Sequence, residues 1–135
     1  MRIAVVALGK IGLPLAVQYA DKGHEVIGVD VNPAVVEAVT WATHGEDFVA
    51  ATGNGALRAT TDYAEAIPEA DAIVLVVPLF VNDATWEPDF AWMDDATRSL
   101  AAHLTPNTLI SYETTLPVGT LRGRFKPMIE EISGL

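Results

Sequence analysis

The chain has 135 residues, 50% of them hydrophobic, and its eighteen acidic and eight basic residues give a formal net charge of −10 at pH 7. This length suits one domain with a substantial core, so we expect residues 1–135 to form a single domain. Few basic residues are available for phosphate contacts, which argues against nucleic acid as a partner. The sequence has no cysteine, which excludes disulfides and thiolate metal sites within it and fits a cytoplasmic protein.

The apolar stretches are too short to cross a membrane. The mean hydropathy of +0.29 is high for a water-soluble protein, but buried parallel strands account for it. The longest apolar run, residues 72–81, contains Pro78 and is shorter than the roughly 20 residues that a spanning helix needs. The N-terminus leads directly into a strand, so we expect neither a signal peptide nor a membrane partner.

The first thirty residues contain the main functional signal. Residues 3–7 form an apolar, β-branched run that is typical of a strand buried on both faces. A turn follows at residues 8–10, then a helical pattern over residues 11–19, and then a second β-branched run at residues 26–29 that ends in Asp30. This succession is the βαβ unit that binds a dinucleotide, with the pyrophosphate at the helix N-terminus.

Two glycines and one acid in this unit have separate roles. Gly9 lets the backbone approach the pyrophosphate, and Gly12 lets the helix lie close to the strand. Ala7 stands where the fingerprint has its first glycine, which alanine can replace if its φ stays negative. Asp30 can accept hydrogen bonds from both adenosine ribose hydroxyls and would repel a 2′-phosphate, which favours NAD over NADP. The alternatives are an empty site and a helix-capping role for Asp30, although Asn32 is the better cap.

The remaining segments alternate helices with strands. We expect helices over residues 33–39, 63–66, 90–104 and 120–132. We expect strands over residues 57–60, 72–77 and 108–112, whereas residues 40–56 show no clear pattern. Thr61 or Asp62 would cap the second of these helices, and Pro127 lies inside the last one. The alternation predicts an α/β fold, a Rossmann-type doubly wound parallel sheet of about five strands in the order 3-2-1-4-5.

Ligands of such a sheet bind beyond the carboxyl ends of its strands. Three loops therefore converge, at residues 7–12, 77–82 and 113–119. Within the second loop, Val77 and Pro78 would line the ribose on the nicotinamide side. The sequence thus predicts one extended site along this edge of the sheet.

The third loop offers a hydroxyl and a carboxylate near the nicotinamide. Thr115 could hold a substrate or a water there, although Thr114 and Thr115 could instead cap the helix that follows. Glu113 is read as a solvated loop carboxylate. Trp86 and Trp92 are read as packing and loop anchors rather than ligand platforms.

Four segments together resemble the N-terminal NAD-binding domain of the UDP-glucose/GDP-mannose dehydrogenase family. They are IAVVALGKIGLPLAVQYADKGHEVIGVDVN, LRATTDYAEAIPEADAIVLVVP, the EPDF segment at residues 87–90, and SYETTLPVGT. The resemblance covers nearly the whole chain except residues 40–56, where the family has a longer helical insertion. It implies a domain whose parent oxidises a nucleotide sugar from primary alcohol to carboxylate with NAD, through a thioester on a cysteine.

The resemblance also implies roles for individual residues. The residues that would cover the pyrophosphate are Gly9, Lys10, Ile11 and Gly12. Asp30 would hold the adenosine ribose, Pro78 would flank the cofactor, and Thr115 would help to position a water in the active site. Leu79 departs from the family, which often has a small or hydroxyl residue there.

The family's catalytic cysteine, its lysine and its sugar-binding residues belong to a central helix and a C-terminal domain, which we expect to be absent from this chain. We therefore expect the chain to bind NAD without turnover, the UDP-sugar being a partner of the full-length parent only. A second hypothesis is a scaffold or interaction module that has lost the cofactor. A complete small dehydrogenase is disfavoured because no general base or nucleophile is evident, and the three histidines match no metal site.

The last expected helix is apolar along more of its length than a lone edge helix needs. Its apolar residues are Leu121, Phe125, Met128, Ile129 and Ile132. Contiguous apolar area seldom stays exposed, so we expect a homo-oligomer through this C-terminal helix. The basic residues between them, Arg122, Arg124 and Lys126, are read as a solvated face.

Overall fold

A computed structural model describes residues 1–43 and 56–135 of the chain. Most of the segment expected to differ from the family, residues 40–56, therefore lies outside the described residues. None of the helices in the described part has the length and apolarity that a membrane span requires.

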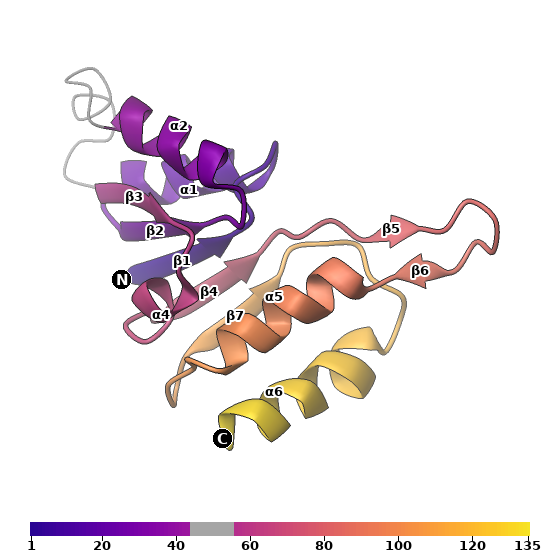
Figure 1. Ribbon diagram of the computed structural model, residues 1–135. Coiled ribbons are helices and arrows are strands. Elements are labelled where there is room, and N and C mark those ends of the chain that lie inside the picture. The colour runs from indigo at the N-terminus through magenta and orange to yellow at the C-terminus, as the bar shows by residue number, and fades with distance from the viewer. Residues whose placement is uncertain (44–55) are drawn as a thin grey trace.

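Five parallel strands form the central sheet in the order β3-β2-β1-β4-β7 (Figure 1). Their bounds are Arg2–Val6 (β1), Glu25–Val29 (β2), Ala56–Thr60 (β3), Ala72–Leu75 (β4) and Leu109–Tyr112 (β7). This order confirms the doubly wound topology expected from the alternation of elements. In the centre, Val6 at the end of β1 lies opposite Val29 of β2 and Leu75 of β4, so these three strands end together at one edge.

Helices cover both faces of the sheet, giving three layers (Figure 1). The helices are α1 (Gly12–Asp21), α2 (Pro33–Thr43), α4 (Tyr63–Ala66), α5 (Ala91–Ala101) and α6 (Lys126–Ser133), with a π-helical turn η1 (Leu121–Phe125) before α6. Alternate side chains of β1 separate the two cores, with Val5 packing on the α1 and α2 side and Val6 on the α4 and α5 side. Alternation along a strand thus produces both cores from one apolar run.

Side-chain caps begin two of the helices. The Asn32 side-chain oxygen accepts a hydrogen bond from the Ala34 N–H (3.0 Å), so Asn32 and not Asp30 caps α2. Asp62 accepts from the Ala64 N–H (2.8 Å) and is the cap of α4, which decides between it and Thr61. Each cap satisfies an N–H that the first helical turn leaves without a partner.

The segment between β4 and α5 differs from the expected loop. β4 ends at Leu75, and a short antiparallel hairpin of β5 (Phe80–Val81) and β6 (Pro88–Asp89) projects from the end of the sheet (Figure 1). In its turn, Asn82 accepts hydrogen bonds through its side chain from the N–H groups of residues 84 and 85. Strands of two residues are too short to show a period, which explains why the sequence pattern missed them.

The expected C-terminal helix over residues 120–132 is present, but its first part is π-helical. The turn η1 precedes α6, and Pro127 lies in the first turn of α6. Proline has no N–H to donate to the preceding turn, and the π-helical turn η1 changes the hydrogen-bond pattern directly before it. Pro127 therefore lies inside the helical segment, as expected, two residues after η1.

Phe125, the last residue of η1, is 1% exposed and stacks on Tyr112 of β7 with the ring centroids 4.7 Å apart. The expectation that it contributes to an exposed apolar stripe is wrong, because η1 turns its ring into the core. Leu121 and Ile132 remain 49% and 37% exposed. The exposed part of the stripe is therefore smaller than the sequence indicated.

The three basic residues of the expected solvated face are all exposed, and Arg124 also binds a neighbouring helix. The Arg124 Nε donates to Oδ1 of Asp94 on α5 (2.8 Å), and its guanidinium lies 4.6 Å from the centre of the Phe90 ring. Lys126 forms an ion pair with Glu130 on its own helix (2.9 Å). Arg124 thus joins the C-terminal segment to α5, which packs against it.

Candidate dinucleotide-binding site

The turn after β1 brings the backbone of α1 directly onto the strand. A Cβ at Gly12 would lie 1.8 Å from the carbonyl oxygen of Ala7, so no larger residue fits there without movement of the backbone. A Cβ at Gly9 would meet no atom within 4 Å. The two glycines therefore differ as expected: Gly12 allows close packing of helix on strand, and Gly9 borders open space.

Ala7 adopts a left-handed backbone conformation, with φ at +73°. The negative φ under which alanine can replace the first glycine of the fingerprint is therefore not met. The Ala7 N–H continues the sheet by donating to the Val29 carbonyl (2.8 Å), while its own carbonyl must lie over Gly12. A non-glycine residue in this region carries a strain of about 1–2 kcal/mol.

Asp30 supports the turn as well as bordering the site. Its Oδ2 accepts from the Leu8 N–H (2.8 Å) and its Oδ1 accepts from the Asn32 N–H (2.9 Å). Leu8 itself is buried against β2, where a Cβ at Gly28 would lie 2.6 Å from its side chain. Because a carboxylate has about four lone-pair sites, Asp30 can still accept hydrogen bonds from a ligand.

A cleft of about 460 Å³ opens at the carboxyl ends of β1, β2 and β4. Four of the predicted site residues line it: Gly9, Asp30, Val77 and Pro78. Lys10 and Ile11 are exposed beside Gly9, and Gly12 is buried beneath the turn. The residues predicted from the first two loops therefore come together at one edge of the sheet.

Helix α5 forms a wall of the cleft that the sequence reasoning missed. Its contributing residues have the helical spacing i, i+3, i+4, i+7, and they are Trp92, Asp95, Ala96 and Ser99. The periodicity that marked this helix came from its other stripe, which packs in the core. The polar stripe would have been found by asking which side of α5 faces the carboxyl edge of the sheet.

The two tryptophans have different environments. Trp92 is 62% exposed, lines the cleft and meets Phe80 edge to face with the centroids 5.0 Å apart. Trp86 is 82% exposed in the hairpin, so its expected packing role is wrong. Trp92 packs against the hairpin and also presents its surface to the cleft.

Tyr63, the first residue of α4, closes the cleft on the side of β3. Burial, helped by the charges of Asp30 and Asp95, raises the pKa of the Tyr63 phenol to about 12. The phenol is therefore neutral throughout the physiological range. It gives this side of the cleft an aromatic wall without a charge.

The third predicted loop is joined to the second by the Thr114 side chain. The Thr114 hydroxyl donates to the Val77 carbonyl (2.9 Å) and so joins the ends of β7 and β4. The following helical segment begins only at Leu121, so the capping alternative for Thr114 and Thr115 is wrong. Thr115 is exposed and lies outside the lining of the cleft, and its role stays a prediction. The exposed Glu113 accepts from the Ser111 hydroxyl (2.6 Å), as a loop carboxylate would.

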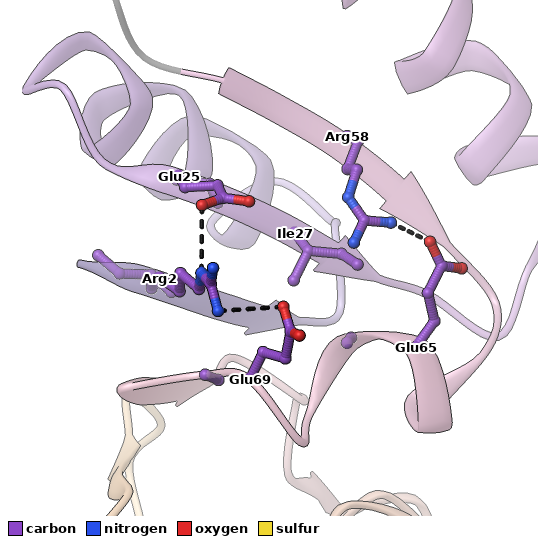
Figure 2. Close-up of a pocket in the computed structure, with 10 residues that line it drawn as sticks. Arg2, Glu25, Ile27, Arg58, Glu65 and Glu69 are labelled. Carbon is purple, nitrogen blue, oxygen red and sulfur yellow. Dashed lines mark hydrogen bonds and ion pairs between the residues drawn. The ribbon is translucent and has the colours of Figure 1, made fainter.

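A second hollow, of about 20 Å³, lies between the sheet and α4 (Figure 2). Arg2 forms ion pairs with Glu25 and Glu69 there, at 3.3 and 3.1 Å, and Arg58 pairs with Glu65. Each of these charged side chains has a partner of opposite charge. The hollow has about the volume of one water molecule. No group of three or more potential metal ligands occurs within residues 1–43 and 56–135.

The parallel sheet, the glycine turn and the acid at the end of β2 define a Rossmann-type dinucleotide-binding domain. The sequence model described as the NAD binding domain of the UDP-glucose/GDP-mannose dehydrogenase family matches residues 1–135. The chain belongs to this family, as its NAD-binding domain. The resemblance and the cofactor expected from the sequence are thereby confirmed.

Similar proteins support this assignment along nearly the whole chain. UDP-N-acetyl-D-mannosamine dehydrogenase of Campylobacter jejuni is 33% identical over 99% of this chain and 34% of its own length. NDP-N-acetyl-D-galactosaminuronic acid dehydrogenase of Ralstonia nicotianae is 38% identical over 87% of this chain and 28% of its own. The solved UDP-D-ManNAc dehydrogenase of Pyrococcus horikoshii superposes with a TM-score of 0.86 at 25% identity, covering 100% of this chain and 33% of that one. The chain thus spans about a third of the length of these relatives.

Proposed function

We propose that the cleft at the carboxyl edge of the sheet binds NAD, and that residues 1–135 form the single cofactor domain of a nucleotide-sugar dehydrogenase. The observation that carries this proposal is the meeting of Gly9, Asp30, Val77 and Pro78 in one cleft. A helix N-terminus lies beside it, and no side chain of the described residues caps that end of α1. The N–H groups of the first helical turn are suited to an anion such as a pyrophosphate.

Each predicted residue receives a role in this arrangement. The pyrophosphate lies over the turn formed by Gly9, Lys10, Ile11 and Gly12. Asp30 accepts hydrogen bonds from the adenosine ribose, while Val77 and Pro78 contact the ribose on the nicotinamide side. Thr115 acts beyond this ribose, where its exposed hydroxyl positions a water or the substrate.

The proposed reaction of the whole protein is oxidation of a nucleotide-sugar primary alcohol to a carboxylate. Support comes from the names of its relatives, which include dehydrogenases of UDP-N-acetyl-D-mannosamine. Because the 135 residues include no cysteine to form a thioester, we propose that they bind NAD without turning over a UDP-sugar. NADH production from UDP-glucose by the purified chain would contradict this. A cytoplasmic location stays a prediction.

Self-association through α6 is also proposed, on a smaller surface than the sequence suggested. Leu121 and Ile132 are the exposed apolar residues of the C-terminal segment, together with Leu135 at 53% exposure. Sedimentation of the chain should show a dimer or larger species that Leu121→Glu weakens. A monomer at high protein concentration would contradict the proposal.

One observation favours the alternative of a scaffold without cofactor. Ala7 is strained at the position where the fingerprint has glycine, and its methyl group borders the cleft. If this methyl group displaces the pyrophosphate, the fold persists without its ligand. Binding measurements distinguish the two functions.

The test is a calorimetric titration of the chain with NAD and with NADP. We expect NAD to bind more tightly, because Asp30 repels a 2′-phosphate. Asp30→Asn removes the charge but keeps one acceptor, so it should weaken NAD binding and narrow the preference over NADP. If the substitution merely loosened the turn, the binding of NAD and of NADP would weaken equally. Asp83→Asn, in the exposed hairpin, is the matched control. Failure of both dinucleotides to bind would support the scaffold.

A further inference from the structure

One half of the cleft is walled by helices and not by the glycine turn. Its lining residues are Asp30 and Val31 after β2, Tyr63 of α4, and Asp95 and Ser99 of α5. In the proposed function the pyrophosphate lies at the end of β1 and the ribose at the end of β2. The base attached to that ribose therefore extends toward β3, into this half of the cleft.

Two adjacent acids of α5, Asp94 and Asp95, differ in whether another side chain binds their carboxylate. Asp94 is bound by Arg124 from the C-terminal segment. Asp95 lines the cleft, and within the described residues its carboxylate accepts no hydrogen bond and forms no ion pair. Its charge reaches Tyr63 across the cleft, where it contributes to the raised phenol pKa. An acceptor thus faces the space that the base would occupy.

We propose that Asp95 accepts a hydrogen bond from the exocyclic amine of adenine, so that the cleft selects a 6-amino purine over a 6-oxo purine. This inference rests on the proposed binding of NAD. An ionised carboxylate only accepts hydrogen bonds, and the amine only donates them. A 6-oxo group would place a second acceptor against the carboxylate, which repels it.

The other walls suit the flat faces of a base. Val31 is 80% exposed and presents an apolar side chain next to Asp30. The Tyr63 ring is half-buried, and burial raises the pKa of its phenol to about 12. Tyr63 is therefore neutral at physiological pH and adds aromatic surface without charge. These two side chains contact any purine alike. Discrimination at the 6-position therefore falls to Asp95.

The experiment compares dissociation constants for NAD and nicotinamide hypoxanthine dinucleotide, whose base carries a 6-oxo group. The parent chain should bind the hypoxanthine form about tenfold more weakly, as loss of a hydrogen bond to a charged group predicts. Asp95→Ala should bring the ratio close to one, mainly by weakening NAD. Asp95→Asn should retain NAD and improve the hypoxanthine form, because an amide can both accept and donate. Asp83→Asn removes a charge outside the cleft and should leave the ratio unchanged.

Circular dichroism of each variant checks that the fold is retained. A ratio near one in the parent chain overturns the inference while the proposed function stands. A ratio that persists in Asp95→Ala also overturns it, because another group would then read the base. Absence of NAD binding by the parent chain would overturn the proposed function and this inference with it.

Discussion

Replacing a glycine by alanine at three different positions separates the contribution of close packing from that of ligand approach. The three positions are Gly9, Gly12 and Gly123. A Cβ at Gly12 would lie 1.8 Å from the Ala7 carbonyl oxygen, and real Cβ contacts essentially never fall below 3.0 Å, so strand and helix must separate by at least 1.2 Å. Such overpacking costs about 1–3 kcal/mol. Gly9 and Gly123 have no atom within 4 Å of an added Cβ. The same methyl group is therefore expected to have three different effects.

Gly12→Ala should lower the free energy of unfolding by about 2 kcal/mol and weaken NAD binding, because the turn must move. Gly9→Ala should keep the stability within about 0.5 kcal/mol. Its methyl group would occupy the space of the pyrophosphate and should reduce NAD affinity about tenfold or more, which corresponds to about 1.4 kcal/mol. Gly123→Ala, in η1, should raise the stability by about 0.5–1 kcal/mol through helix propensity, with NAD affinity unchanged.

Urea denaturation and calorimetric titration of the three variants measure both quantities. Gly12→Ala unfolding at the same urea concentration as the parent would refute the close contact with Ala7. Unchanged NAD affinity of Gly9→Ala would refute the placement of the pyrophosphate. A destabilised Gly123→Ala would show that the open space beside that residue is not available.

Three further predictions concern strain, ionisation and the C-terminal segment. Ala7→Gly should raise the free energy of unfolding, measured in urea, by about 0.5–1 kcal/mol. The relief of strain in the left-handed conformation exceeds the entropy that glycine adds to the unfolded chain. An unchanged free energy of unfolding would refute the strain. Stability should fall as the pH rises from about 10 to about 12, because an unfolded tyrosine loses its proton near 10 while burial holds Tyr63 and Tyr112 protonated to about 12. Thermal unfolding measured between these pH values should show a smaller fall in stability for the double variant Tyr63→Phe and Tyr112→Phe. Arg124→Ala should destabilise the chain by about 1 kcal/mol in urea through loss of its ion pair and ring contact, whereas Arg122→Ala, which is exposed, should have no effect.

The stability of each variant and its affinity for NAD have to be measured under separate conditions. A ligand that binds only the folded chain raises the apparent stability by an amount that grows with the logarithm of its concentration. Denaturation is therefore compared without NAD. Binding is then measured at a temperature well below the unfolding transition of each variant.

Features that depend on short-range pattern could be predicted from the amino-acid sequence. The β-branched runs, the helix between them and Asp30 predicted the βαβ unit, and the alternation of elements predicted the strand order. Asn32 was identified as the cap of α2. These features follow from periodicity and from contacts within a few residues, which are visible in a linear sequence.

Features that join distant segments of the chain could not be predicted from the sequence, because they depend on how the elements pack. The positive φ of Ala7 arises because its carbonyl must lie over Gly12 while its N–H remains paired with β2. Thr114 bonds the end of β4, thirty-seven residues away, rather than capping a helix. Tyr63 and Asp95 come to the same cleft because α4 and α5 pack on one face of the sheet. A linear pattern shows which side of a helix is apolar, but what its polar side faces depends on how the layers pack.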